Sequence, residues 1–273
     1  MQSLTQLRHE PTEKRVRIVD GGVVVAETTG ALLVWEPRRI VPSYAVPEDD
    51  LRAALVPAAA APSSDAEILH PGIPFAAHST SGQAYDVDTG AQVRAQAAFR
   101  PDDADLSGHL ILDFPAFDEW YEEAERIVSH PRDPYHRVDV RASDRSVRIE
   151  RDGVVLAESN RALLLFETGL PTRFYLPVED VAAEVTPSTR HTACAYKGQA
   201  SYWNVGGHRD LAWSYPEPLP DAGQIAGRLA FWNERVDLFV DGQPRQRPGG
   251  AIARTMVEEA GVGEPPAGSR SDR

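Results

Sequence analysis

The sequence contains a long internal repeat, and this repeat restricts the chain to a duplicated architecture. Residues 147–175 reproduce residues 16–44 at a shift of 131, with identity at 13 of the 29 aligned positions. After one deletion the shift becomes 130. A repeat of this length indicates duplication of a whole domain and not a short solenoid unit. We predict a first repeat at 1–132, a second at 133–248 and a flexible C-terminal tail at 249–273. The identities include Val16/Val147, Gly22/Gly153, Leu32/Leu163, Leu33/Leu164, Glu36/Glu167 and Tyr44/Tyr175.

The pattern inside each repeat is that of a mainly β domain. Each copy opens with two runs rich in valine and isoleucine on either side of a glycine turn, Asp20-Gly21-Gly22 in the first and Asp152-Gly153 in the second. Such a pattern is a strong β-hairpin signal, because glycine accepts the positive φ of a tight turn. Further apolar runs follow in both copies. They predict antiparallel strands, with short helices near 48–55 and 178–184, where proline precedes acidic residues.

Composition narrows the class of partners. The chain has 273 residues, of which 42% are hydrophobic and 25% charged, so each half is long enough to bury its own core. No window approaches 18 apolar residues and the N-terminal stretch lacks a signal peptide's apolar segment, which predicts a cytoplasmic location away from membranes. The net charge of −13 argues against nucleic acid as a partner.

The densest group of reactive side chains lies in residues 191–205, HTACAYKGQASYWNV. It holds Cys194, the only cysteine, followed by Lys197 and the aromatic pair Tyr202 and Trp203. A cation lowers the pKa of a neighbouring thiol, so Cys194 is a candidate nucleophile and Lys197 a candidate base or Schiff-base group. In the alternative interpretation Cys194 is a small apolar core residue, and this is favoured because Cys-x-x-Lys is no recognised catalytic spacing.

Other polar residues end the apolar strands of the second copy, namely Arg161, Glu167, Tyr175 and Asp180. They can converge on one rim of a sheet and hold a ligand, or Arg161 can pair with Glu167 while Asp180 starts a helix. The scattered histidines and the single cysteine offer no metal-ligand spacing, so no metal site and no cofactor are expected.

Three stretches resemble a bacterial family filed as domain of unknown function 427, sometimes labelled nucleotidyltransferase-like. They are residues 161–181, 192–203 and 231–242, and the linker 130–141 resembles that of members with two tandem copies. The resemblance implies a small antiparallel β domain of Mss4-like or β-tent topology. Relatives in that fold group often hold zinc on paired cysteines, which a chain with one cysteine cannot do. No Gly-Ser followed by paired aspartates supports the nucleotidyltransferase label.

We predict a small-molecule-binding module with its pocket in the second repeat. Two cations of the pocket would attract an anionic group and its rings would stack on an aromatic one. An enzyme using Cys194 or Lys197, and an interaction protein using a sheet edge, are alternatives, and the oligomeric state is not predicted. The predicted pocket residues are Arg161, Tyr175, Cys194, Lys197, Tyr202 and Trp203.

The two copies are predicted to be functionally unequal. Matching Gly82-Gln83-Ala84 with Gly198-Gln199-Ala200, at a shift of 116, places His78 at Cys194 and Ser81 at Lys197. The first copy also has glycine where the second has Arg161, yet it keeps the apolar pattern. It is therefore expected to act as a scaffold.

Overall fold

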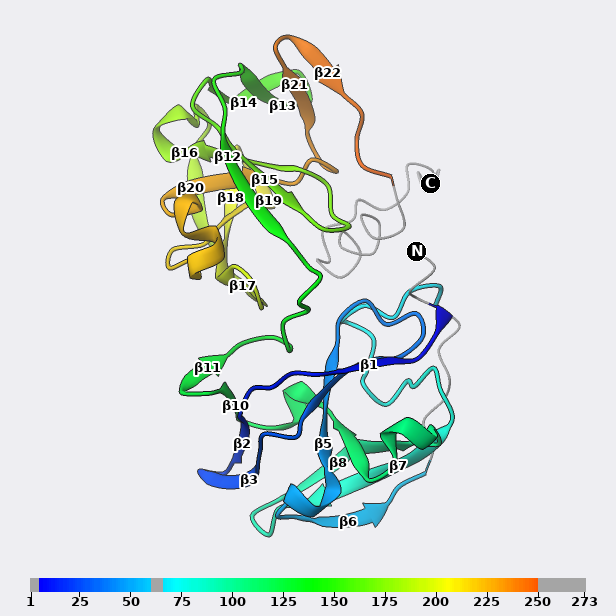
Figure 1. The fold of residues 1–273 in the computed structure, drawn as a ribbon. Helices are drawn as coiled ribbons and strands as arrows, with labels where there is room; N and C mark the ends of the chain where they lie inside the picture. The colour runs from blue at the N-terminus through cyan, green and yellow to red at the C-terminus, as the bar shows by residue number, and fades with distance from the viewer. Residues whose placement is uncertain (1–4, 60–65, 250–273) are drawn as a thin grey trace, which may run out of the picture. The chain divides into compact units, whose positions relative to one another are not determined.

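The computed structural model describes residues 5–59 and 66–249, and the chain divides into two compact units, one ending at Pro134 and one beginning at Tyr135 (Figure 1). The predicted C-terminal tail lies outside the described residues except for Gly249. Within the described part, no helix has the length and apolar character needed to cross a membrane.

The first unit is built from short antiparallel strands and single turns of 3-10 helix. Its strands are β1 (Arg8–Pro11), β2 (Val16–Asp20), β3 (Val23–Thr28), β4 (Leu32–Trp35), β5 (Ser43–Pro47), β6 (Ala54–Pro57), β7 (Gly82–Asp88), β8 (Val93–Pro101), β9 (His109–Leu112), β10 (Glu119–Glu122) and β11 (Glu125–Ile127). Its 3-10 helices are η2 (Glu48–Asp50), η3 (Ala104–Leu106) and η4 (Phe114–Ala116).

The second unit repeats this plan. Its strands are β12 (Val138–Ala142), β13 (Val147–Arg151), β14 (Val154–Ser159), β15 (Leu163–Glu167), β16 (Arg173–Pro177), β17 (Val185–Cys194), β18 (Gly198–Val205), β19 (His208–Ser214), β20 (Arg228–Phe231), β21 (Asp237–Val240) and β22 (Gln243–Arg245). Its 3-10 helices are η5 (Val178–Asp180) and η6 (Pro220–Ile225). The helices expected at 48–55 and 178–184 are thus single 3-10 turns, each ending before an extended residue.

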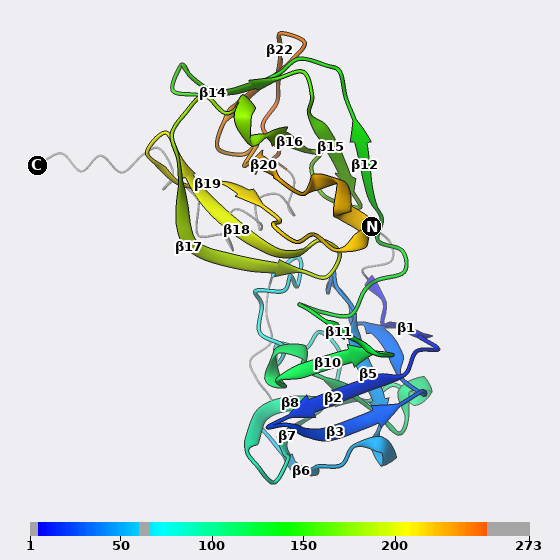
Figure 2. The ribbon, with the colours of Figure 1, turned by 90° about the vertical axis from the view of Figure 1, so that its left-hand side faces the viewer.

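The two units share one sheet topology. The seven-stranded sheet has the order β1-β4-β5-β9-β8-β7-β6 in the first unit and β12-β15-β16-β20-β19-β18-β17 in the second. The four-stranded sheets, β11-β10-β2-β3 and β22-β21-β13-β14, also match. The strands of the first of these sheets are labelled in Figure 2. The prediction of a mainly antiparallel β chain is confirmed, and both glycine turns connect hairpin strands, β2–β3 and β13–β14.

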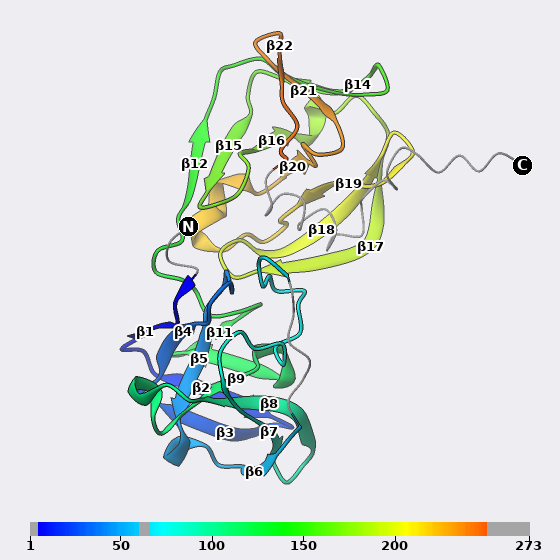
Figure 3. The same ribbon diagram turned by 90° about the vertical axis from the view of Figure 1, so that its right-hand side faces the viewer.

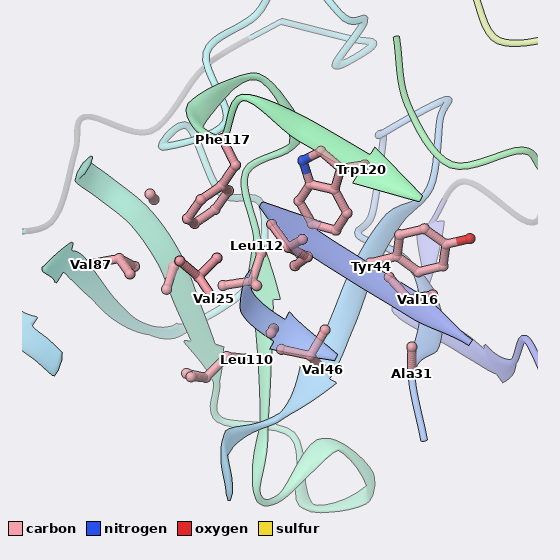
Figure 4. Packing of buried hydrophobic residues seen from close by; sticks show 14 of the residues in the cluster. Val16, Val25, Ala31, Tyr44, Val46, Val87, Leu110, Leu112, Phe117 and Trp120 are labelled. Carbon is pink, nitrogen blue, oxygen red and sulfur yellow. The ribbon is translucent and has the colours of Figure 1, made fainter. Parts of the chain in front are cut away.

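Side chains alternate along each strand, so each seven-stranded sheet has two faces. Both faces carry buried apolar clusters. The first face packs against the four-stranded sheet and forms the main core. In the first unit Trp120 belongs to that core together with Tyr44 and Phe117 (Figure 4). Its ring is stacked on Tyr44 and Phe114 and edge-on to Phe117. We call the opposite side the second face. In the second unit it carries most of the predicted site residues.

Candidate functional site

The second face of the second unit is lined by aromatic residues. Strands β16, β18 and β19, which are labelled in Figure 3, each supply one, and two more follow the ends of β19 and β20. The 3-10 helix η6 adds the buried Ala222 and Ile225. Trp213 lies in the middle, 4.8 Å from the ring of Trp232 and 6.5 Å from each of Tyr175 and Tyr202. We call this set the aromatic cluster: Tyr175, Tyr202, Trp213, Tyr215 and Trp232.

A buried ion pair lies beside the aromatic cluster. Glu167 ends β15, and its carboxylate oxygens each lie 2.5 Å from Lys197 Nζ in the turn between β17 and β18. His136 Nε2 lies 3.0 Å from Glu167 Oε1, and because an ionised carboxylate only accepts, this nitrogen donates. The Glu167 and Lys197 side chains are only 5% and 8% exposed. The pair is therefore almost free of solvent screening.

The pair keeps both groups charged at neutral pH. Burial acts to raise the pKa of Glu167, but the His136 hydrogen bond and the Lys197 ammonium outweigh it and lower that pKa to about 2. Burial likewise acts to lower the pKa of Lys197, but the carboxylate of Glu167 outweighs it and raises that pKa overall. Lys197 is therefore held as an ammonium ion, which does not form a Schiff base until it loses a proton.

The thiol of Cys194 is next to this pair. Cys194 ends β17, three residues before Lys197 in the β17–β18 turn, and its half-buried thiol packs against the aromatic cluster. Burial raises the pKa of Tyr175, which is partly offset by a 3.2 Å hydrogen bond from Trp213 Nε1 to its hydroxyl. Burial raises the pKa of Tyr215 too, and nearby Tyr175 and Cys194 add to that rise. Four predicted residues, Tyr175, Cys194, Lys197 and Tyr202, thus belong to one group.

The other two predicted residues lie elsewhere. Trp203 is on the first face of β18, because it follows Tyr202 directly, and its indole nitrogen donates to Ser214 Oγ at 2.9 Å. Arg161 is half-exposed and pairs with Asp180 at 2.6 Å and Glu179 at 3.6 Å. The expected Arg161–Glu167 pair does not form, since each residue has another partner.

Several residues of the group were missed in the sequence. His136 is 31 positions from Glu167 and stacks on Tyr196 with ring centroids 4.2 Å apart. Arg190, on the edge strand β17, places its guanidinium 4.8 Å from the centre of the Tyr202 ring. Trp232 is 4% exposed, and its indole nitrogen is buried with no hydrogen-bond partner among the described residues. An unpaired buried donor costs free energy unless something accepts from it.

The first unit carries a comparable charged group on its own second face. Glu36, the repeat equivalent of Glu167, is buried and accepts from Arg39 Nε at 3.3 Å, His78 Nδ1 at 3.2 Å and the Ser79 amide at 3.1 Å. Burial raises the pKa of Glu36, but these partners outweigh it and lower the pKa overall. The first unit has therefore not lost its buried polar group, contrary to the expectation that it keeps only the apolar core.

Strand pairing also corrects the alignment of the repeats. Tyr44 pairs with Leu33 whereas Tyr175 pairs with Leu163, the equivalent of Leu32, so the two tyrosines lie on opposite faces. The shared tyrosine at a shift of 131 is a coincidence of letters.

Strand pairing also changes the predicted alignment of β7 with β18 at a shift of 116. Val87 pairs with Leu55 and Val205 pairs with Val185, and because Leu55 and Val185 are equivalent at a shift of 130, β7 and β18 match at 118. Continued back along the chain, this shift places Ser79, not Ser81, at the position of Lys197.

Comparison with known proteins identifies the class to which this fold and site belong. A family model described as Domain of unknown function (DUF427) matches residues 8–65 and 139–242, more than half of the chain. The chain belongs to this family, and the two matched segments fall one in each unit. No curated protein matches the sequence.

Proposed function

We propose that the protein is a small-molecule-binding module and that its ligand site is the charged and aromatic group on the second face of the second unit. The observation that carries the proposal is the buried Glu167–Lys197 pair, hydrogen-bonded to His136 and close to Cys194, beside aromatic rings. Buried ion pairs rarely stabilise a fold better than apolar residues of similar volume, and groups with strongly shifted pKa values concentrate at functional sites. Tyr175, Cys194, Lys197 and Tyr202 remain the proposed ligand-binding residues.

The chemistry of the group favours a planar ligand with hydrogen-bond acceptors. The buried indole N–H of Trp232 can donate to such an acceptor, and the rings of the aromatic cluster can stack on a planar face. Glu167 neutralises Lys197, so that lysine adds little net attraction for an anion. Arg190, whose guanidinium lies 4.8 Å from the centre of the Tyr202 ring, is a second cation of the group that can meet an anionic group.

A thermal-shift screen of the full chain with aromatic carboxylates and mononucleotides tests this proposal. A compound at 100 times its Kd would add about 2.7 kcal/mol to the free energy of unfolding. We expect Trp232→Phe, which keeps a ring and removes the unpaired N–H, to reduce the shift from a stabilising compound. Trp203→Phe, which alters the opposite face, is the control and should leave the shift unchanged. Equal shifts in both variants would contradict the proposed location.

An enzyme using Cys194 is a second candidate, and the position of Cys194 beside the Lys197 turn between β17 and β18 supports it. The two functions differ in the reactivity that they require of the sulfur. Rapid stoichiometric labelling of Cys194 by dilute iodoacetamide at neutral pH would favour the enzyme. A thiol that stays unlabelled while a compound stabilises the protein would favour the binding module.

A further inference from the structure

We infer that the first unit carries a divalent metal site formed by His9, Asp103 and Asp105. His9 lies on the edge strand β1, and the two aspartates lie at the start of η3. One ligand atom from each of the three side chains lies within 4.8 Å of the other two. Metal–ligand bonds of about 2.0–2.2 Å place donor atoms roughly 3–4 Å apart, so small side-chain rotations would close the site around an ion.

The charges of the two aspartates are not offset by a basic side chain in the described part of the chain. Across residues 5–59 and 66–249, neither Asp103 nor Asp105 forms an ion pair with lysine or arginine. Two like charges therefore approach one another beside an imidazole with no cation to compensate them. Asp103 is held in place, since its Oδ1 accepts from the Asp105 amide at 2.9 Å.

In the second unit, the position equivalent to His9 is occupied by an apolar core residue. His9 pairs with Val34 and Val140 pairs with Leu165, and because Val34 and Leu165 are equivalent, His9 occupies the place of Val140. Val140 is 7% exposed and belongs to the apolar cluster that includes residues of η6. The first unit thus has an imidazole where the second has a core valine, facing the 3-10 helix that carries the two aspartates.

The donor set indicates a first-row transition metal. An imidazole nitrogen suits zinc, cobalt and nickel, whereas magnesium and calcium prefer oxygen ligands only. Three protein ligands leave positions for water or a substrate atom, the arrangement of an exchangeable site and not of a closed structural one. No local pattern indicates this site, because His9 is 94 positions from Asp103 in the sequence.

The test is equilibrium dialysis of the full chain against Zn²⁺, with Co²⁺ absorption as a second readout. We expect one tightly bound ion, and we expect His9→Val and Asp105→Asn each to weaken it at least about tenfold, since loss of even an outer-shell partner has that effect. His9→Val copies the residue of the other repeat and should fold. His109→Val and Asp102→Asn are matched controls, a second histidine and a neighbouring aspartate of the same unit.

The inference fails if the chain binds no stoichiometric Zn²⁺, or if His9→Val and Asp105→Asn bind it as the unmodified protein does. It also fails if the control variants lose the ion to the same extent, because binding would then reflect the overall negative charge. The d–d absorption bands of bound Co²⁺ should disappear in His9→Val and persist in His109→Val. Persistence in both would exclude His9 as a ligand.

Discussion

Replacing Lys197 by methionine should strongly destabilise the second unit, because it leaves the Glu167 carboxylate buried without its cation. The two side chains are 8% and 5% exposed, so water cannot replace the lost partner. Removing one partner of a buried pair costs about 3–5 kcal/mol. The fall in the pKa of Glu167 from 4.5 to about 2 corresponds to roughly 3 kcal/mol of net favourable interaction, to which His136 and Lys197 both contribute.

The loss should depend on pH in a defined direction. In the unmodified protein the pKa of Glu167 is lowered, so its stabilising contribution is present above pH 4.5 and is lost as the pH falls toward about 2. Without Lys197, His136 alone opposes the effect of burial, so the pKa of Glu167 rises from its lowered value. The variant therefore gains less stability than the unmodified protein as the pH rises, so its deficit should be largest near neutral pH and shrink in acid.

Urea unfolding followed by tryptophan fluorescence at neutral and mildly acidic pH measures both effects. Arg161→Met is the control, because it removes a half-exposed ion pair worth less than about 1 kcal/mol. The double variant Glu167→Gln/Lys197→Met should recover part of the loss. A cost no larger than that of Arg161→Met, or a deficit that does not change with pH, would refute the reasoning.

Three further outcomes follow from the structure. Burial raises the pKa of Asp113 to about 6, so the first unit should lose stability as the pH rises through that value, and Asp113→Asn should stabilise it by roughly 2–3 kcal/mol at pH 7 in urea unfolding. Gly198→Ala should lower the melting temperature more than Gly153→Ala: both glycines have positive φ, but only the new Cβ at 198 would meet a backbone oxygen, that of Glu217, at 3.2 Å. Residues 135–249 expressed alone should unfold in one cooperative transition by circular dichroism, and a gradual melt would show that the units share a core.

Local sequence patterns predicted the strands and hairpins well, but they did not predict which distant strands pair. The glycine turns and apolar runs specify hairpins because both signals act within a few residues. The match of Tyr44 with Tyr175 was wrong because a shift of one residue moves a side chain to the other face of a strand, and only strand pairing fixes that shift. Adjacent residues of a strand point to opposite faces, so Tyr202 and Trp203 of β18 lie on different faces. The prediction that both line one pocket was therefore avoidable from the sequence.

The candidate site was predicted only in part, because some of its residues are close in sequence and others come from distant strands. Cys194, Lys197 and Tyr202 lie close in sequence and stay close in the β17–β18 hairpin. The partners that set their chemistry come from distant strands, since Glu167 and His136 precede Lys197 by 30 and 61 positions. A charged residue at the end of an apolar run, such as Glu167, is visible in the sequence, but its partner is decided by the order of strands in the sheet.

The most direct test of the central claim is a crystal structure of the full chain with a compound that stabilises it in the thermal-shift screen. We predict that the compound lies on the second face of the second unit, within hydrogen-bond distance of Trp232 Nε1 and in contact with Tyr202 or Cys194. Binding at the Glu36 group of the first unit, or on the first face beside Trp203, would contradict the account.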